Sequence, residues 1–423
     1  MASPPEFDQD HERQQRSNLE VLWERFRPRA RTQTKTPGAI VLGGDYRGLA
    51  VVRSLGRHGI PVWVFTDEHT VAGTSRYAVQ TSSLPDSDRE QVSLLQDLAL
   101  EQGVEGWVVF PTGDRTAAML ARNHACLDGR LRLTVPEWSV FMWAHDKRRT
   151  YELARSLGLA CPWTRYLQDD AEVENLDCLF PVILKPATKE ALNRFTQEKV
   201  WLAPDRETLL QRYQEARALV PAEEVMIQEF IPGEGDSQLA FAALCEAGEP
   251  LASIVVRRAR QYPRDFGLSS SFVESVECRE VEDAARRLLK AMRYTGLVEV
   301  EFKYDSREMS FKLLDVNPRV WGWHSLGRRA GVDFPYLGWQ HSQGMPVDRI
   351  RGRTGVRWVR AVTDIPAVAA EMRAGTLSPA EYVKSLRGPV EYAIWAPDDP
   401  LPALLEVPLL ARLAWKRRRS HQW

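Results

Sequence analysis

The chain has 423 residues, and its 56 lysines and arginines nearly balance its 57 aspartates and glutamates. This balance argues against a dedicated nucleic-acid-binding protein, which is usually strongly basic, and the length predicts about two to four domains. The sequence contains no run of about 18 apolar residues, which argues against a membrane-spanning helix, and its start lacks the apolar stretch of a secretory signal. The five scattered cysteines form no CxxC pair, which favours a reducing, cytoplasmic compartment.

The first part of the chain predicts a tail followed by a parallel sheet. Residues 1–37 are polar and rich in proline, glutamine and arginine, which predicts a flexible tail. Apolar strands are predicted at 39–42 and 62–65 with a helix between them, and the pattern recurs near 107–110. Strand, helix and parallel strand in this order predict a Rossmann-like α/β domain over residues 38–145.

The turn after the first strand, GGDYRG, is similar to a dinucleotide-binding loop only in part. Its glycines do not have the GxGxxG spacing, so the turn favours a tight connection between strand and helix over a nicotinamide site. A nicotinamide-dependent oxidoreductase is therefore the remote alternative.

The pattern changes after residue 145. Beyond a helix near 146–157, strands prevail and long helices are few, which predicts an α+β domain with antiparallel sheets over 146–345. Residues 346–423 predict an extension of loop and helix. The predicted helices of the middle region are 206–219 and 281–292, and its predicted strands are 182–184, 199–202, 225–231, 238–244, 252–258, 297–302 and 310–316.

Two of these strands bring acidic side chains to one face. Glu299 and Glu301 alternate with apolar residues, and Asp315 and Asn317 stand two residues apart in the next strand. A short connection predicts an antiparallel hairpin, which brings Glu301, Asp315 and Asn317 together. Carboxylate and amide oxygens suit Mg²⁺ or Mn²⁺. The alternative is the solvated polar face of a surface hairpin.

The segments GLVEVEFKYD and FKLLDVNPRVWGW resemble the metal-binding hairpin of the ATP-grasp superfamily. In that family a Glu, an acid fourteen residues later and an Asn two residues further bind the magnesium ions of Mg-ATP. The resemblance implies these roles for Glu301, Asp315 and Asn317. The second acid is usually Glu, and this chain has Asp315. The resemblance also implies that Arg319 stabilises the transferring phosphoryl group.

Further segments resemble the same family in the same order. Lys147 and Lys185 match lysines that contact ATP phosphates, although a lysine at a strand end is often only a surface residue. Residues 180–235 would form the lid over ATP, and the stretch 187–199 has basic residues where many relatives have glycines. The resemblance implies that the nucleotide is contacted by Gln228, Glu229 and Ile231 at the adenine and by Glu234 or Asp236 at the ribose.

The resemblance implies an ATP-grasp fold and a ligase that depends on ATP and magnesium. A small-molecule carboxylate would be activated as an acyl phosphate and then attacked by an amine, as in the D-aspartate-ligase and carbamoyl-phosphate-synthase-like branches, which are the most similar. Two alternatives stay open: the activation of bicarbonate, and a nucleotide-binding regulatory module without catalysis.

An arginine-rich strand precedes a loop at 269–271. Alternation would place Arg258 and Arg260 on one face. Guanidinium groups suit carboxylate or phosphate, which makes Arg258 a candidate for substrate binding. The alternative, with equal weight, is that these arginines lie on an edge strand and prevent it from pairing with another chain. Trp321 and Trp323 either shape the pocket or pack in the core.

The C-terminus combines an apolar run with a basic cluster. Residues 403–415 are rich in leucine, and Lys416 and three arginines follow them. Pro408 favours a break in this helix. Such a segment fits an anionic membrane surface, which would place a cytoplasmic enzyme at the inner face of the membrane. Packing of the helix on the body of the protein is the alternative.

Overall fold

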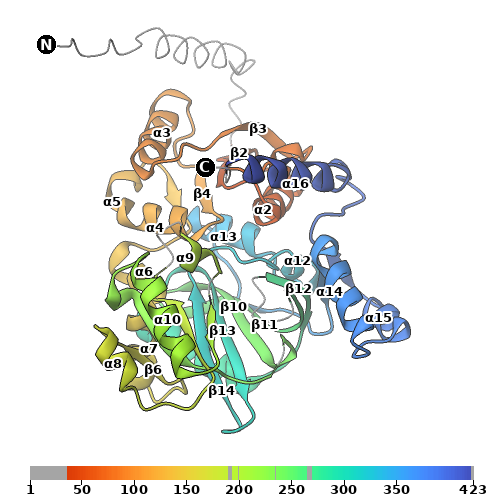
Figure 1. Cartoon of the computed structure of the whole chain (residues 1–423). Helices are drawn as coiled ribbons and strands as arrows, with labels where there is room; N and C mark the ends of the chain where they lie inside the picture. Colours follow the sequence, from red (N-terminus) through yellow and green to blue (C-terminus); the bar gives the residue numbers. More distant parts are fainter. Residues whose placement is uncertain (1–35, 189–192, 199, 234, 264–268, 421–423) are drawn as a thin grey trace, which may run out of the picture. The chain divides into compact units, whose positions relative to one another are not determined.

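The computed structural model describes residues 36–188, 193–198, 200–233, 235–263 and 269–420. The chain divides into two units, Met1–Thr36 and Pro37–Trp423, and nearly all of the first unit, including the predicted tail, lies outside the described residues. The described part of the second unit contains three sheets (Figure 1).

The predicted Rossmann-like domain is confirmed. Its parallel sheet has the strand order β3-β2-β1-β4-β5. β1 and β2 are buried along their whole length, as expected for a parallel sheet that is covered on both faces. The elements are β1 (Ala39–Leu42), α2 (Tyr46–Arg57), β2 (Val62–Thr66), η1 (Val71–Thr74), β3 (Ala78–Ser83), α3 (Asp88–Glu101), β4 (Val108–Pro111), α4 (Asp114–Arg122), α5 (His124–Leu127), β5 (Arg132–Leu133) and α6 (Trp138–His145).

The turn between β1 and α2 has no space for larger residues. Gly43 has a φ of +120°, and a Cβ at this position would lie 2.0 Å from Thr112 Oγ1. Asp45 caps α2 because its side chain accepts from the backbone N–H groups of Arg47, over 2.9 Å, and Gly48, over 3.3 Å. Packing and capping therefore account for this glycine-rich turn.

A smaller antiparallel sheet has the order β6-β9-β7-β8. One face packs against α10 around Leu184, Tyr213 and Ile227. The sequence predicted three of its strands to within about two residues at each end. The elements of this region are α7 (Lys147–Ser156), β6 (Thr164–Tyr166), α8 (Asp170–Glu174), β7 (Val182–Pro186), α9 (Arg194–Glu198), β8 (Trp201–Ala203), α10 (Arg206–Arg217), η2 (Ala222–Glu224) and β9 (Val225–Glu229).

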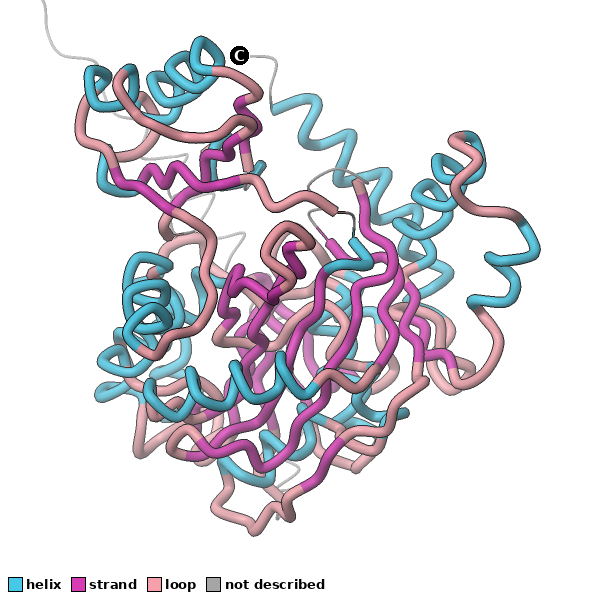
Figure 2. The backbone as a smooth tube through the Cα atoms, turned by 90° about the horizontal axis from the view of Figure 1, so that it is seen from below, coloured by secondary structure: helices cyan, strands magenta, loops and turns pink. Residues whose placement is uncertain are grey.

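The central sheet has eight strands in the order β14-β13-β10-β11-β12-β16-β17, with β15 beside β11 (Figure 2). Phe241 and Val298 pack with α11 in one core cluster, and Trp321 and Trp358 lie in another. The remaining elements are η3 (Gly235–Ser237), β10 (Gln238–Glu246), β11 (Glu249–Tyr262), β12 (Ser269–Ser275), α11 (Arg279–Met292), β13 (Gly296–Asp305), β14 (Ser310–Asn317), α12 (Leu326–Ala330), α13 (Phe334–Ser342), β15 (Ile350–Arg351), β16 (Arg357–Val359), α14 (Ala361–Arg373), α15 (Pro379–Ser385), β17 (Val390–Tyr392) and α16 (Leu401–Ser420).

Three details differ from the sequence predictions. β16 and β17 extend the central sheet beyond residue 345, where loop and helix were predicted, because three-residue strands show no periodicity. Residues 269–271 lie in β12 and not in a loop, since pairing with β11 outweighs the weak strand preference of serine. α16 continues through Pro408. Both Pro408 and Leu404 are exposed, so the carbonyl that loses its helical donor can bind water.

Candidate active site

A cavity of about 240 Å³ is lined by residues of the central sheet, the smaller sheet and the first turns of α2 and α7. Its lining includes six cationic and four acidic residues. Of the two predicted site residues that are not in the lining, Asp236 is exposed in η3 and Glu234 lies outside the described residues. The other ten predicted residues line the cavity: Lys147, Lys185, Gln228, Glu229, Ile231, Arg258, Glu301, Asp315, Asn317 and Arg319.

β13 and β14 bring the predicted metal-binding residues together. In the strand register, Glu301 lies opposite Asp315 and Glu299 lies opposite Asn317. The side-chain amide of Asn317 donates to Glu299 Oε2 over 3.0 Å and to Glu301 Oε1 over 3.2 Å. Glu299 therefore belongs to the same cluster. The alternation along the strand predicted that Glu299 shares a face with Glu301, but the family resemblance implied no role for Glu299.

The cluster brings carboxyl groups close together, and one of them, Glu299, is buried. Burial raises the pKa of Glu299 to about 8, and the neighbouring carboxylate of Glu301 is the second cause. Trp323 Nε1 donates to Glu299 Oε1 over 2.7 Å, and Arg258 Nη2 lies 3.3 Å from Glu301 Oε1. Oxygen donors that repel one another fit a divalent cation, which would offset the repulsion. Trp321, in contrast, packs in the core.

A second acidic trio, formed by Glu229, Asp305 and Glu308, has the spacing of a metal site, but an ammonium group fills it. Lys312 Nζ lies 2.7 Å from Glu229 Oε1, 3.0 Å from Asp305 Oδ2 and 2.7 Å from Glu308 Oε1. The ion pairs also engage the side chain of Glu229. A nucleotide contact of this residue would therefore come from its backbone.

Two predicted phosphate-binding lysines reach the cavity from different elements, α7 and β7. Lys147, at the start of α7, is buried, and its Nζ lies 3.0 Å from Asp315 Oδ1. Lys185, on β7, lies 3.4 Å from the side-chain oxygen of Gln228. Gln228 is itself buried, and its amide donates to Thr164 Oγ1 over 3.0 Å. The lysines are thus held at defined positions around the cavity.

The hinge after β9 is held by a lysine that was not predicted. Lys303 Nζ donates to the carbonyl oxygen of Ile231 over 2.7 Å and lies 5.6 Å from the centre of the Phe230 ring. Burial lowers the pKa of Lys303, and the carboxylates of Asp305 and Asp236 partly counteract this effect. Position 303 continues the alternation of 299 and 301, and this signal could have found it.

The prediction that Arg258 and Arg260 share a face is wrong. An irregularity in the pairing of β11 with β12 falls between them and breaks the alternation. Arg258 lines the cavity, whereas Arg260 is buried and donates to both oxygens of Asp364 over 2.8 and 2.9 Å. Arg260 therefore attaches α14 to the sheet and is not available to a ligand.

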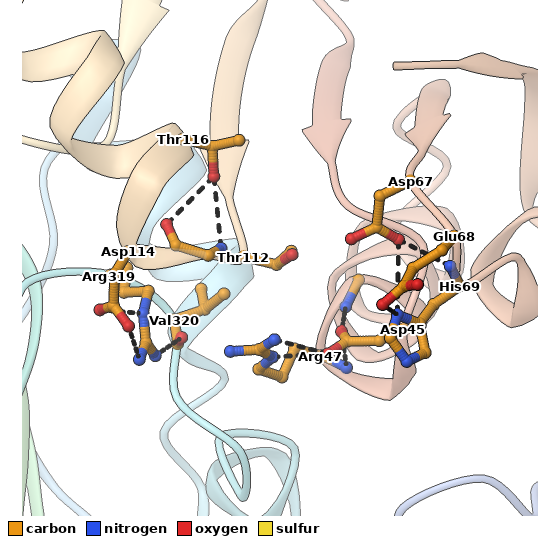
Figure 3. Close-up of polar contacts among 12 residues, drawn as sticks. Asp45, Arg47, Asp67, Glu68, His69, Thr112, Asp114, Thr116, Arg319 and Val320 are labelled. Atoms are coloured by element: carbon orange, nitrogen blue, oxygen red, sulfur yellow. Dashed lines mark hydrogen bonds and ion pairs between the residues drawn. The ribbon is translucent and has the colours of Figure 1, made fainter. Parts of the chain in front are cut away.

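The N-terminal domain supplies two charged residues near the hairpin. Asp114 accepts from Arg319 Nε over 2.8 Å and from its Nη2 over 3.1 Å. Arg47 lines the same cavity, and Figure 3 shows it together with Asp45 on the other side of the view from the Arg319–Asp114 pair. Asp114 and Arg47 follow the carboxyl ends of β4 and β1. Ligands of parallel α/β sheets bind at this edge, and this rule could have found both residues.

Comparison with known proteins identifies the fold and a partial match to one family. A sequence model described as "ATP-grasp in the biosynthetic pathway with Ter operon" matches residues 222–365, which include β9, the acidic hairpin and Arg319. The crystal structure of an L-amino acid ligase from Bacillus licheniformis superimposes with a TM-score of 0.56 at 15% identity, over 73% of this chain and 75% of that chain. The chain has an ATP-grasp fold, and its residues 222–365 match an ATP-grasp family model.

Two more proteins are similar to this chain. The D-aspartate ligase of Enterococcus faecium is 22% identical over 299 residues, which cover 66% of this chain and 70% of that ligase. The biotin carboxylase domain of a Hydrogenobacter thermophilus 2-oxoglutarate carboxylase has a TM-score of 0.59 at 16% identity, over 76% of this chain and 74% of that chain. That domain was crystallised with Mg-ADP and bicarbonate. Because the two solved structures are only 15% and 16% identical to this chain, their similarity establishes the fold alone.

Proposed function

We propose that this ATP-grasp protein is an ADP-forming ligase that joins a small-molecule carboxylate to an amine. A carboxylate oxygen attacks the γ-phosphorus of ATP and ADP leaves, which gives an acyl phosphate. The amine nitrogen attacks the acyl carbon, inorganic phosphate leaves and the nitrogen loses a proton. The observation that carries the proposal is the cavity itself, in which an acid and amide cluster lies among six cationic residues. The similarity to a D-aspartate ligase supports the same reaction class.

The acidic hairpin is the proposed metal site. Glu301, Asp315 and Asn317 would supply oxygen ligands, and Glu299 orients Asn317 by accepting from its amide. Asn317 would have to turn its amide oxygen toward a cation, because its nitrogen now faces the two glutamates. When bound, magnesium neutralises phosphate oxygens and so eases attack on the γ-phosphorus.

The cationic residues fit the remaining charges of the reaction. Lys147 and Lys185 would contact the ATP phosphates as compact point charges. Arg319, held by Asp114, would donate to the oxygens on which charge develops during transfer. Arg258, beside Glu301, would bind the reacting carboxylate.

The hinge is the proposed adenine site. Gln228 pairs with strands on both sides, so its backbone is occupied by the sheet. β9 ends at Glu229, Phe230 and Ile231 follow the strand, and all three residues line the cavity. We therefore place the adenine contacts at these residues, with the N–H of Ile231 as the donor. Asp236 or Glu234 would accept from the ribose hydroxyls.

Trapping with hydroxylamine tests the proposed reaction without knowledge of the amine. An acyl phosphate reacts with hydroxylamine to give a hydroxamate and phosphate. Purified protein, Mg-ATP, hydroxylamine and single carboxylic acids should yield ADP and hydroxamate in equal amounts with at least one acid. Glu301→Gln and Asn317→Ala should abolish both products, whereas Glu308→Gln in the neighbouring trio should retain them. ADP without hydroxamate, or full activity of the first two variants, would contradict the proposal.

Activation of bicarbonate is the second candidate, because a structurally similar carboxylase domain binds bicarbonate with Mg-ADP. This function predicts that bicarbonate alone stimulates ADP release. ADP release that bicarbonate does not stimulate would exclude bicarbonate activation. ATP binding without ADP release under all conditions would instead favour a regulatory module.

We also propose that α16 contacts an anionic membrane surface. Its inner face packs on the body through Leu409 and buried Leu413, but Leu404, Val407 and Trp415 are 68%, 64% and 55% exposed. No described helix is long and apolar enough to cross a membrane. Basic residues beside an exposed apolar face suit the interface of anionic lipids.

Vesicle flotation tests the membrane contact. The full chain should float with phosphatidylglycerol vesicles and less with phosphatidylcholine vesicles. Replacement of Leu404, Val407 and Trp415 by glutamine should reduce flotation at least about fivefold, whereas Val79→Gln, at an equally exposed valine of β3, should not. Equal flotation of both variants would exclude this role of α16.

A further inference from the structure

Arg47 lines the cavity but has no role in the proposed chemistry. Its side chain is 26% exposed, and Nε and Nη2 each lie 2.7 Å from Asp45 Oδ2. One edge of the guanidinium is therefore bound. The described residues provide Nη1 with no hydrogen-bond partner. Figure 3 shows the guanidinium extending away from Asp45 toward Arg319 and Val320.

The turn that carries Arg47 is fixed by residues distant in sequence. The carbonyl oxygen of Arg47 lies 3.1 Å from His324 Nε2, which must donate because a carbonyl only accepts. The guanidinium of Arg360 lies 4.2 Å from the centre of the Tyr46 ring. A Cβ at Gly322 would lie 2.9 Å from the Tyr46 hydroxyl, so this glycine leaves the space that Tyr46 uses. Because the turn is fixed before a ligand binds, less entropy is lost on recognition.

The outer edge of Arg47 fits one kind of ligand group. A guanidinium offers paired N–H donors and no acceptor, which match the oxygens of a carboxylate or phosphate. Arg258, Arg319 and the acidic hairpin line the same cavity of about 240 Å³. A cavity of this size holds a small molecule, and such a molecule would face both the hairpin and Arg47.

We propose that Arg47 binds a second carboxylate of the acid substrate, so that the enzyme acts on dicarboxylic acids. The inference rests on the proposed function, which places the reacting carboxylate beside Arg258 and the hairpin. The carboxylate bound by Arg47 does not react, and it fixes the orientation of the substrate while the other carboxylate attacks ATP. A substrate without this carboxylate gives the free edge of Arg47 no acceptor in the cavity, and binding is weaker.

Matched acids test this specificity in the hydroxylamine assay. Each dicarboxylic acid is compared with its half-amide: succinate with succinamate, and both enantiomers of aspartate and glutamate with asparagine and glutamine. We expect kcat/KM of at least one diacid to exceed that of its half-amide by about 10- to 100-fold. Arg47→Gln should lower kcat/KM for the diacid to the half-amide value and leave the half-amide unchanged. Half-amides or phosphorylated monocarboxylic acids that work as well as the diacids would overturn the proposal.

Arg115 provides a matched control. Like Arg47, it lies in the first turn of a helix in the N-terminal domain and binds a nearby acid, Asp88 Oδ1 over 2.9 Å, but it is outside the cavity lining. Arg115→Gln should keep the preference for diacids. The same loss of preference in both variants would overturn a specific role of Arg47.

Thermal unfolding with Mg-ADP tests binding without turnover. In the wild type, at least one of these diacids should raise the unfolding midpoint more than its half-amide does, and Arg47→Gln should remove this difference. Equal shifts for every wild-type pair would overturn the proposal, even if hydroxamate forms. A diacid-selective shift that depends on Arg47, without hydroxamate from any acid, would retain the binding site and reject the proposed reaction.

Discussion

Arg319 donates to both carboxylate oxygens of Asp114, over 2.8 and 3.1 Å, although 205 residues separate the two in the sequence. Asp114 begins α4 after β4, and Arg319 follows the acidic strand β14. The pair therefore joins the edge of the N-terminal sheet to the loop beside the hairpin. Arg319 Nη2 also lies 3.4 Å from Asn317 Oδ1, so this contact reaches the proposed metal site.

Asp114→Asn should slow the reaction without unfolding the protein. The amide keeps the size of the side chain but loses the charge that directs Arg319. We expect kcat for ADP release to fall by about 10- to 100-fold, with little change in the thermal unfolding midpoint. Asp88→Asn removes a similar pair with Arg115 at the surface and should leave kcat unchanged. Equal kcat values in the two variants would show that Asp114 does not position Arg319.

Lys147→Met should destabilise the protein. Lys147 and Asp315 have side-chain exposures of only 5% and 15%, so loss of the ammonium removes a close cation from a largely buried carboxylate. We expect the free energy of unfolding in urea to fall by about 3 kcal/mol. Combining it with Asp315→Asn should recover part of this loss, because the buried negative charge is removed as well. A single variant as stable as the wild type would contradict the assignment of this pair as a buried contact.

The pH dependence of stability should include a contribution from His324. Burial lowers the pKa of this side chain to about 4, although its hydrogen bond to the carbonyl of Arg47 opposes the shift. A histidine in the unfolded chain titrates near 6.5. Between about pH 6.5 and 4 the unfolded state therefore binds more protons, and acidification through this window lowers stability.

His324→Gln isolates this contribution because glutamine retains an N–H donor but does not titrate. We expect the urea midpoint to fall more in the wild type than in His324→Gln when the pH is lowered from about 7 to about 5. Equal decreases would mean that His324 is neutral in both states or charged in both.

Much of the fold and of the acidic cluster could be predicted because the signals are local. The alternation along β13 and β14 fixes which side chains share a face, and the short connection fixes the pairing. Glu301, Asp315 and Asn317 were therefore predicted to lie together, and the register confirms it. The apolar runs of β1 and β2 likewise predicted a buried parallel sheet.

Other parts of the site depend on contacts that no local pattern contains. Arg47 lines the cavity and Asp114 binds Arg319 because the N-terminal sheet meets the loop after β14, and both roles depend on partners far away in the sequence. The separation of Arg258 from Arg260 depends on an irregularity in strand pairing. The side chain of Glu229 is bound by Lys312, 83 residues away.

The transfer of an oxygen isotope tests the acyl phosphate most directly. An acid that supports turnover is labelled with ¹⁸O in its carboxylate, and the inorganic phosphate released with the amine is measured by mass spectrometry. Attack of the carboxylate on the γ-phosphorus predicts one ¹⁸O atom in each phosphate. Phosphate without label would show that water attacks ATP directly, and it would contradict the proposed reaction.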